Sequence, residues 1–425
     1  MFRSFRHSAT VAVLLISVLQ FPLAVARAKH ISLKADQSLS KSGKEIRKTS
    51  KPPVNIQGPG VVTQPGQLII SEFRLHGPNG NEDEFIELYN TTPSSLVAQA
   101  SDASTGLGVA ASDGVVRCIV PNGTTIPARG HYLCANNTAT TGYSLSAYPS
   151  GNNGGSATTA TPDATYTTNI TNNIGIALFN SATTFTLANR LDAVGPSTEA
   201  NTTYKEGTGY TAVATALVNF SLYRINDSST GLPLDTGNNA TDFRTVAVNA
   251  NASLPTASLG APGPENLTSP IIRNATIKAS YVAPCVAGTA APNRIRTGSG
   301  NSGSLSIRRR FTNNTGANVT RLRFRIIDIT TAPAPNGSTA ILAATSSTTT
   351  TEAQPCPSGT VTVNGLTLET PPTQALGGGY NSSLSAGTVT LGTPIAPGAS
   401  INVNFLLNIS QAGTFRFFVN VEALP

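Results

Sequence analysis

Imidazole is the scarcest chemically useful group in this chain of 425 residues. Beyond the first sixty residues only His76 and His131 remain. His131 lies three residues before Cys134 in an apolar run typical of a strand, so a structural role is favoured over a catalytic one. A Ser-His-Asp or Cys-His site has few candidate members, and no nucleophile elbow, phosphate-binding loop or His-Glu-x-x-His motif occurs. The sequence therefore predicts that the protein is not an enzyme.

Acidic residues cluster at Glu82-Asp83-Glu84, with Glu87 close behind, and paired carboxylates of this kind carry out glycoside cleavage. Side chains alternate between the two faces of a strand. In an extended segment, Glu84 and Glu87 therefore point in opposite directions. This geometry favours a structural role for both.

A loop rich in Asp and Asn offers the oxygen ligands that calcium prefers. Its candidate ligands are Asp235, Asn238, Asn239 and Asp242. The alternative is an Asx-turn loop in which these side chains bond their own backbone. The alternative is favoured, and calcium is the one cofactor that the sequence suggests.

Arginines are the sharpest feature of the C-terminal half. In one segment they alternate with apolar residues, which places three of them on one face of a strand. A basic face of this kind suits an anionic glycan, a lipid headgroup or nucleic acid; the alternatives are a solvated face or a face that docks against the acidic first domain. Nucleic acid is disfavoured because few aromatic residues are interleaved. The six candidate residues are Arg308, Arg309, Arg310, Arg321, Arg323 and Arg325.

The net charge of +7 is unevenly distributed. Residues 1–28 resemble an export signal, with Arg3 and Arg6 before an apolar run and Ala26-Arg27-Ala28 at the expected cleavage point. Residues 29–66 are basic and rich in Ser, Pro and Gly, and are predicted to be a disordered tether. Residues 67–266 hold 7 basic and 15 acidic residues, whereas residues 267–425 hold 11 and 4. Such opposite balances predict either two domains that attract each other or two surfaces with different partners.

Cysteines occur two in each half, without the Cys-x-x-Cys spacing of a metal site. In an exported chain this even distribution predicts one disulfide per domain. We expect the pairs Cys118–Cys134, between neighbouring strands, and Cys285–Cys356.

Short alternating segments separated by turn residues predict strands throughout, with no sustained helical periodicity after residue 28. The expected domains are 67–262 and 270–425, joined by a Gly- and Pro-rich boundary, and 149–173 is expected to be a long loop. The strands expected in the second domain are 271–281, 303–313, 319–329, 360–368, 387–391, 400–409 and 414–421. This spacing is typical of antiparallel sandwiches.

The strand Ile69-Ile70-Ser71-Glu72-Phe73, followed by Glu84-Phe85-Ile86-Glu87-Leu88, resembles the opening of the lamin tail domain in its bacterial secreted form. Further ordered matches reach Asp242-Phe243 and leave the second domain uncovered. The resemblance implies an immunoglobulin-like sandwich with a binding or structural role.

Together these observations predict a secreted, all-β chain: an immunoglobulin-like lamin-tail sandwich followed by a second antiparallel β-sandwich. The expected function is non-enzymatic binding or scaffolding at the cell surface, with no transmembrane segment after signal cleavage. The alternative is an accessory domain that recruits an envelope nuclease or hydrolase. A protein or an anionic envelope component is the expected partner.

Overall fold

A computed structural model describes residues 61–153, 156–214, 216–333 and 339–424 of the chain. The expected signal, 1–28, and most of the expected tether, 29–66, lie outside the described residues. Nearly all regular structure is strand, which confirms the predicted all-β sandwich class. The described helical turns are brief: η1 (Leu187–Asn189), η2 (Thr202–Tyr204) and α1 (Asn239–Asp242). Within the described ranges, no helix has the length and apolar character needed to span a bilayer.

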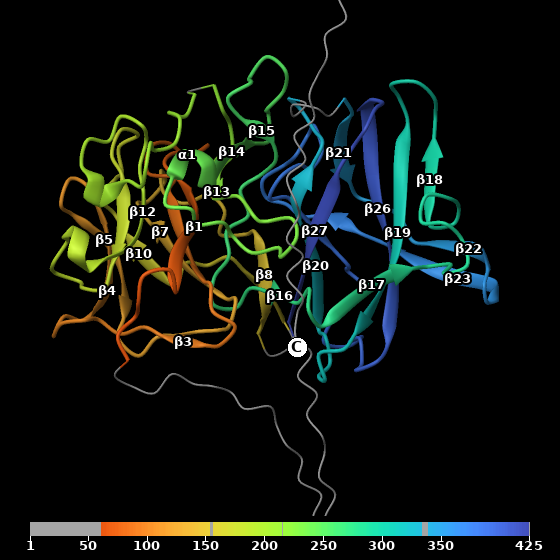
Figure 1. Ribbon diagram of the computed structural model, residues 1–425, viewed down its shortest axis with the longest axis horizontal. Coiled ribbons are helices and arrows are strands. Elements are labelled where there is room, and N and C mark those ends of the chain that lie inside the picture. The colour runs from red at the N-terminus through yellow and green to blue at the C-terminus, as the bar shows by residue number, and fades with distance from the viewer. Residues whose placement is uncertain (1–60, 154–155, 215, 334–338, 425) are drawn as a thin grey trace, which may run out of the picture. The chain divides into compact units, whose positions relative to one another are not determined.

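The first half is a sandwich of two sheets, drawn from red to green in Figure 1. The larger sheet has the order β10 (Ala164–Tyr166), β7 (His131–Asn136), β2 (Phe85–Asn90), β1 (Leu68–Arg74), β13 (Phe220–Arg224), β14 (Phe243–Ala247) and β15 (Ser258–Leu259). The smaller sheet has the order β12 (Arg190–Val194), β11 (Ile176–Phe179), β4 (Gly106–Ala111) and β5 (Val116–Pro121). Two short ribbons pair β3 (Leu96–Val97) with β6 (Thr125–Ile126) and β8 (Pro149–Asn153) with β9 (Ser156–Thr159).

Strand β2 carries apolar side chains on one face and both polar and apolar side chains on the other. Ile86 and Leu88 lie in the main core of the first half, between the two sheets. Glu87 is also buried, although it is on the opposite face. Both faces of β2 are therefore covered, and the polar face needs partners from elsewhere in the chain.

The predicted disulfide Cys118–Cys134 is present, with its Cα atoms 6.3 Å apart. The expectation that its cysteines lie on neighbouring strands is wrong. Cys118 is on β5 of the smaller sheet and Cys134 is on β7 of the larger sheet. The bond therefore ties the two layers of the sandwich together across the core.

The second half, drawn from teal to blue in Figure 1, is a second two-sheet sandwich. One sheet has the order β16 (Ile271–Ile272), β27 (Phe417–Leu424), β20 (Arg321–Ile329), β25 (Ser383–Ser385) and β24 (Thr367–Leu368). The other has the order β17 (Ile277–Tyr281), β19 (Ser304–Asn313), β26 (Ser400–Gln411), β23 (Ser358–Gly365) and β22 (Thr350–Pro355). In addition, β18 (Arg294–Thr297) pairs with β19, and β21 (Ile341–Thr345) pairs with β26.

The single strand expected at 271–281 is in fact two strands in different sheets. β16 pairs with β27 for two residues, after which the chain crosses to the other sheet and continues as β17. A turn at 273–276 makes the crossing, with the N–H of Thr276 donating to the carbonyl of Arg273 at 2.9 Å. Within the described chain, the outer edge of β27 therefore has no strand partner beside Phe417 and Val419. The sandwich is open along this edge.

Two other expectations are corrected. Residues 387–391, expected to be a strand, form turns and bends, and the pairing strand is β25, a few residues earlier. The expected loop at 149–173 contains three short strands, of which β10 extends the larger sheet by pairing in parallel with β7.

The segment that joins the two halves is buried rather than exposed. Residues 261–266 are all buried. On either side of them the halves exchange backbone hydrogen bonds: the N–H of Leu259 donates to the carbonyl of Ala332 at 2.8 Å, and the N–H of Tyr380 donates to that of Leu259 at 2.9 Å. Tyr223 of β13 also packs into the core of the second half. The halves therefore meet along a continuous packed boundary.

Candidate functional site

The arginines of β20 lie where the two halves meet. Arg323 is fully buried and Arg325 is 6% exposed, whereas Arg321 is half-buried. The predicted alternation is present, but this face of β20 is not open to a glycan or a lipid headgroup. Of the alternatives drawn from the sequence, the structure corresponds to the one in which the arginines dock against acidic groups of the first half.

Glu265 and Glu422 hold these two guanidinium groups. Glu422 of β27 accepts from the Nε of Arg323 at 2.7 Å and from the Nε of Arg325 at 2.9 Å. Glu265, in the buried connecting segment, pairs with both arginines through its two carboxylate oxygens, one of them 2.9 Å from Arg325 Nη2. Each carboxylate therefore bridges two arginines, and the four groups form a closed ring of ion pairs.

His131 extends the ring into the first half. Its Nδ1 lies 3.0 Å from an oxygen of Glu87, and its Nε2 lies 3.1 Å from an oxygen of Glu265. Both ring nitrogens thus lie within hydrogen-bond distance of a carboxylate, and a nitrogen that carries a proton can donate to it. We call Glu72, Glu87, His131, Glu265, Arg321, Arg323, Arg325, Glu369 and Glu422 the junction cluster.

The junction cluster holds more carboxyl groups than arginines. Three arginines face five carboxyl groups; Arg321 completes the set through Glu369 at 2.8 Å. Burial, together with the neighbouring charge of Glu87, raises the pKa of Glu72 to about 7. A protonated Glu72 reduces the excess of negative charge, which lowers the cost of burying so many charges together.

Three of these residues, Glu87, His131 and Glu265, bring their ligand atoms within 4.8 Å of one another. The chemistry available to them is nevertheless limited. The cavity beside them has a volume of about 30 Å³, which is room for water rather than for a substrate. Glu265 already pairs with Arg323 and Arg325, and Glu87 accepts from the hydroxyl of Ser71 and the N–H of Glu265. The arrangement is that of a structural clamp.

The four candidate calcium ligands lie together around α1, but their side chains already have protein partners. The oxygen of Asn238 caps α1 by accepting from the N–H of Ala240. Asn239 is buried and bonds three backbone groups of other segments. Asp242 accepts from the backbone N–H and the hydroxyl of Thr236, at 2.9 and 2.6 Å.

Asp235 pairs with Arg224 at 3.3 Å. Asn238 and Asp242 therefore organise the backbone of their own loop, as in the Asx-turn alternative, whereas Asn239 and Asp235 bond other segments.

The side chains of Glu84 and Glu87 point into different surroundings, because side chains alternate between the two faces along a strand. Glu84 accepts from the N–H of Ile170 at 2.7 Å and from the side chain of Asn136, whereas Glu87 belongs to the junction cluster. The two carboxylates are thus separated by the sheet. The other histidine beyond residue 60, His76, packs on Phe220 with ring centroids 4.6 Å apart.

The three consecutive arginines of β19 divide between the two faces of their sheet. Arg308 pairs with Glu352 at 2.7 Å, and Arg310 donates to Asn402 at 3.2 Å. Arg309 points the other way, into the opening between the two sheets of the second half, where it lies 5.0 Å from the ring centroid of Tyr281. Only this member of the six candidate arginines lines the open cleft described next.

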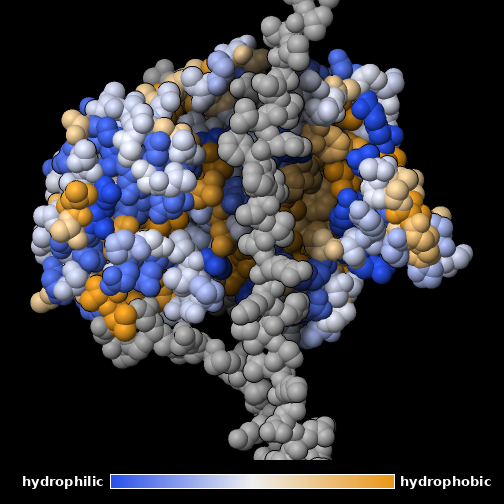
Figure 2. Space-filling view, in the orientation of Figure 1, coloured by the Kyte–Doolittle hydropathy of each residue, from blue (hydrophilic) through white to orange (hydrophobic). Residues whose placement is uncertain are grey.

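A cleft of about 420 Å³ occupies the open edge of the second sandwich, between β17 and β19 on one side and β27 on the other. Figure 2 shows it as a hollow of hydrophobic colour to the right of the centre. The lining is apolar and aromatic, with two arginines and an asparagine: Asn274, Ile277, Ala279, Arg294, Ile307, Arg309, Phe311, Phe405, Phe415, Phe417, Val419 and Val421. A second hollow of about 210 Å³ adjoins it and shares Arg294 and Phe415. Sequence reasoning missed this cleft.

Strand register explains why Arg294 and Arg309 come together. Arg294 of β18 lies opposite Ile307 of β19, and Arg309 is two residues further along β19, so all three point to the same face of the sheet. Burial lowers the pKa of Arg309, and the positive charge of Arg294 lowers it further. A guanidinium nevertheless stays charged at neutral pH.

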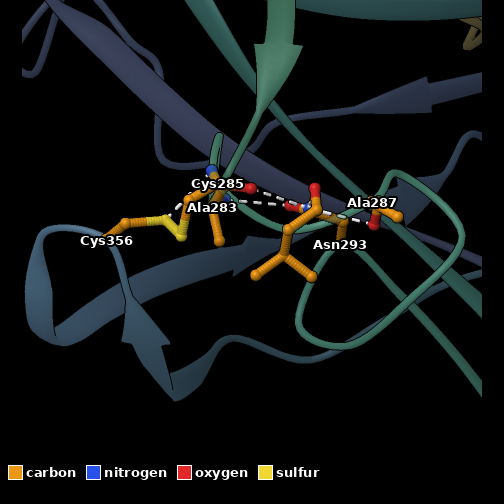
Figure 3. The surroundings of a disulfide bond; sticks show 6 residues. Ala283, Cys285, Ala287, Asn293 and Cys356 are labelled. Atoms are coloured by element: carbon orange, nitrogen blue, oxygen red, sulfur yellow. Dashed lines mark hydrogen bonds between the residues drawn. A yellow bond between two sulfur atoms is a disulfide. The ribbon is translucent and has the colours of Figure 1, made fainter.

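Asn293 and the second disulfide fix the loop that precedes Arg294, and Figure 3 shows the disulfide and the hydrogen bonds of Asn293. The side chain of Asn293 is fully buried, accepts from the N–H of Ala283 at 2.9 Å and donates to the carbonyls of Ala283 and Val286. These bonds close the loop from 283 to 293. The predicted bond Cys285–Cys356, which is present, ties that loop to the turn between β22 and β23. The residue that enters the cleft is thus the first one after a doubly fixed loop.

The acids of the second half are all committed elsewhere. Residues 267–425 contain four: Asp328, Glu352, Glu369 and Glu422. They pair respectively with Arg416, Arg308, Arg321 and the arginines of the junction cluster. Among the described residues, therefore, no carboxylate faces Arg294, Arg296 or Arg309 at salt-bridge distance.

Comparisons of the chain with protein-family models, with curated proteins and with solved structures found no match. The assignment of the candidate site therefore depends on the geometry of the structure alone.

Proposed function

We propose that this chain is a non-enzymatic extracellular binding protein, in which a lamin-tail-like sandwich is fused rigidly to a second sandwich that carries the ligand site. The ligand site is the apolar cleft between β17, β19 and β27. The observation that carries the proposal is the contrast between this open cleft and the closed junction cluster.

The groups that could react chemically are buried, whereas the groups that a ligand can reach line the cleft. His131, Glu87 and Glu265 are buried and ion-paired, so they offer no substrate access. The cleft, by comparison, exposes Phe417 and Val419 at an unpaired strand edge. A volume of about 420 Å³ is within the range of small-molecule binding sites.

An extracellular location is part of the proposal. Two disulfides, one in each half, are typical of proteins that mature in an oxidising compartment. The lamin-tail likeness is also part of the proposal, and it depends on the sequence of the opening strands, Ile69-Ile70-Ser71-Glu72-Phe73 and Glu84-Phe85-Ile86-Glu87-Leu88.

The test uses Nile red, an uncharged apolar dye whose fluorescence rises on leaving water. Titration of the full chain should give saturable fluorescence with one site. Val419→Gln, which places a polar group in the cleft, should weaken dye binding at least tenfold. Phe418→Gln changes the neighbouring residue on the opposite face of β27 and should leave binding unchanged. Equal effects of both variants, or no saturable binding, would contradict the proposal.

A further inference from the structure

Like the partly buried Arg273 and Arg310, the two arginines of the cleft have no carboxylate partner among the described residues, whereas the buried arginines of the second half do. Arg323 and Arg325 meet Glu265 and Glu422, and Arg308 meets Glu352. Arg294 and Arg309, in contrast, repel one another across a partly buried apolar surface with no described carboxylate in reach. Two like charges placed together in this way are stabilised by an external anion.

The surface behind these arginines is suited to hydrocarbon. Phe311 and Phe405 come from one sheet, while Phe417 and Val419 come from the other, so the cleft is walled by core-type side chains on both sides. Phe405 packs edge-on to Phe417, with centroids 5.7 Å apart, at the base of this wall. In the described chain, the edge of the sandwich that a further strand would cover is open instead.

We propose that the cleft binds a single-chain amphiphile with an anionic head, a free fatty acid, with its carboxylate between Arg294 and Arg309 and its chain along Phe311, Phe405 and Phe417. This inference rests on the proposed function, because it names the ligand class of the same cleft. The planar fork of each guanidinium can donate to both oxygens of a carboxylate. The adjoining hollow beside Arg294 provides further room for the chain.

The experiment is a calorimetric titration of the full chain with saturated fatty acids of increasing length, each below its micelle concentration. Affinity should rise about fourfold for each added methylene until the cleft is full and then level off. The methyl ester of the same acid should bind at least tenfold more weakly, because its head carries no charge. An alkyltrimethylammonium of equal length should not bind.

Matched variants assign the head group. Arg309→Gln and Arg294→Gln should each weaken binding of the acid about tenfold while leaving binding of the ester unchanged. Arg310→Gln is the control, since it lies next to Arg309 on the opposite face of β19. Circular dichroism and melting of each variant establish that it is folded.

Three outcomes would overturn the inference. In the first, Nile red still binds the cleft but no fatty acid does, which leaves the proposed function standing. In the second, acid and ester bind equally, which removes the role of the arginines. In the third, the chain sediments with phosphatidylglycerol vesicles in an Arg309-dependent manner but binds no free acid, which would assign the arginines to a membrane headgroup. Loss of Nile red binding as well would instead contradict the proposed function.

Discussion

Replacing Arg323 should be among the most damaging single changes in this protein. Arg323→Met keeps most of the side-chain volume and removes the charge. Glu422 would then keep Arg325, and Glu265 would keep Arg325 and His131, in a buried site. Removing one partner of a buried ion pair costs about 3–5 kcal/mol, because the other charge is left uncompensated. If the m-value is about 3 kcal/mol/M, the urea midpoint should fall by about 1–2 M.

The assay is urea unfolding followed by circular dichroism, with two further variants. Arg323→Lys keeps the charge but loses the bridging fork, and should fall between the wild type and Arg323→Met. Arg296→Met changes an exposed arginine and should cost within ~0.5 kcal/mol. A midpoint for Arg323→Met within about 0.2 M of the wild type would refute the reasoning and would show that the junction cluster contributes little to folding.

Further expectations concern pH, the disulfide and calcium. The pKa of Glu72, raised to about 7 in the folded chain, means that its stabilising protonation is complete below about pH 4.5 and is lost as pH rises through 7. Unfolding at pH 4.5 and pH 8 should therefore show Glu72→Gln gaining a few kcal/mol on the wild type at the higher pH, and equal differences at both pH values would contradict this. The pair Cys118→Ala with Cys134→Ala should lower the free energy of unfolding by about 3 kcal/mol, measured by urea titration, because it opens the link between the two sheets. Because Asp242 already bonds Thr236, millimolar calcium should leave the melting temperature unchanged; a rise of several degrees would restore the calcium hypothesis.

The sequence predicts the strand faces well where the alternation is regular. Arg321, Arg323 and Arg325 do share one face of β20, as period two requires. Whether that face is buried depends on Glu265 and Glu422, which lie tens of residues away along the chain. In the sequence, the sign of this contact was the opposite charge balance of the two halves. That balance predicted that the halves attract each other, but it did not show which residues form the ion pairs.

The open cleft was harder to predict because it arises from a strand that changes sheet. Neither Gly nor Pro marks the crossing within residues 271–281; only the polar residues Arg273, Asn274 and Thr276 do. The excess of 11 basic over 4 acidic residues, interpreted from the sequence as attraction between the halves, also means that some basic residues of the second half have no carboxylate of that half to pair with. It could not separate Arg309, which enters the cleft, from Arg308 and Arg310, because that depends on which face of β19 turns inward.

The buried segment at 261–266 bears on how such a chain can change over generations. Modules that are joined by an exposed linker can be exchanged between genes, because the surface of each module is complete without the other module. Here the second half covers the acidic face of the first half, and the first half covers the arginines of β20. A gene that gained the second half alone would carry Arg323 and Arg325 onto a bare surface. We therefore expect relatives to carry the two halves together, and expect those that have the first half alone to lack a glutamate corresponding to Glu265.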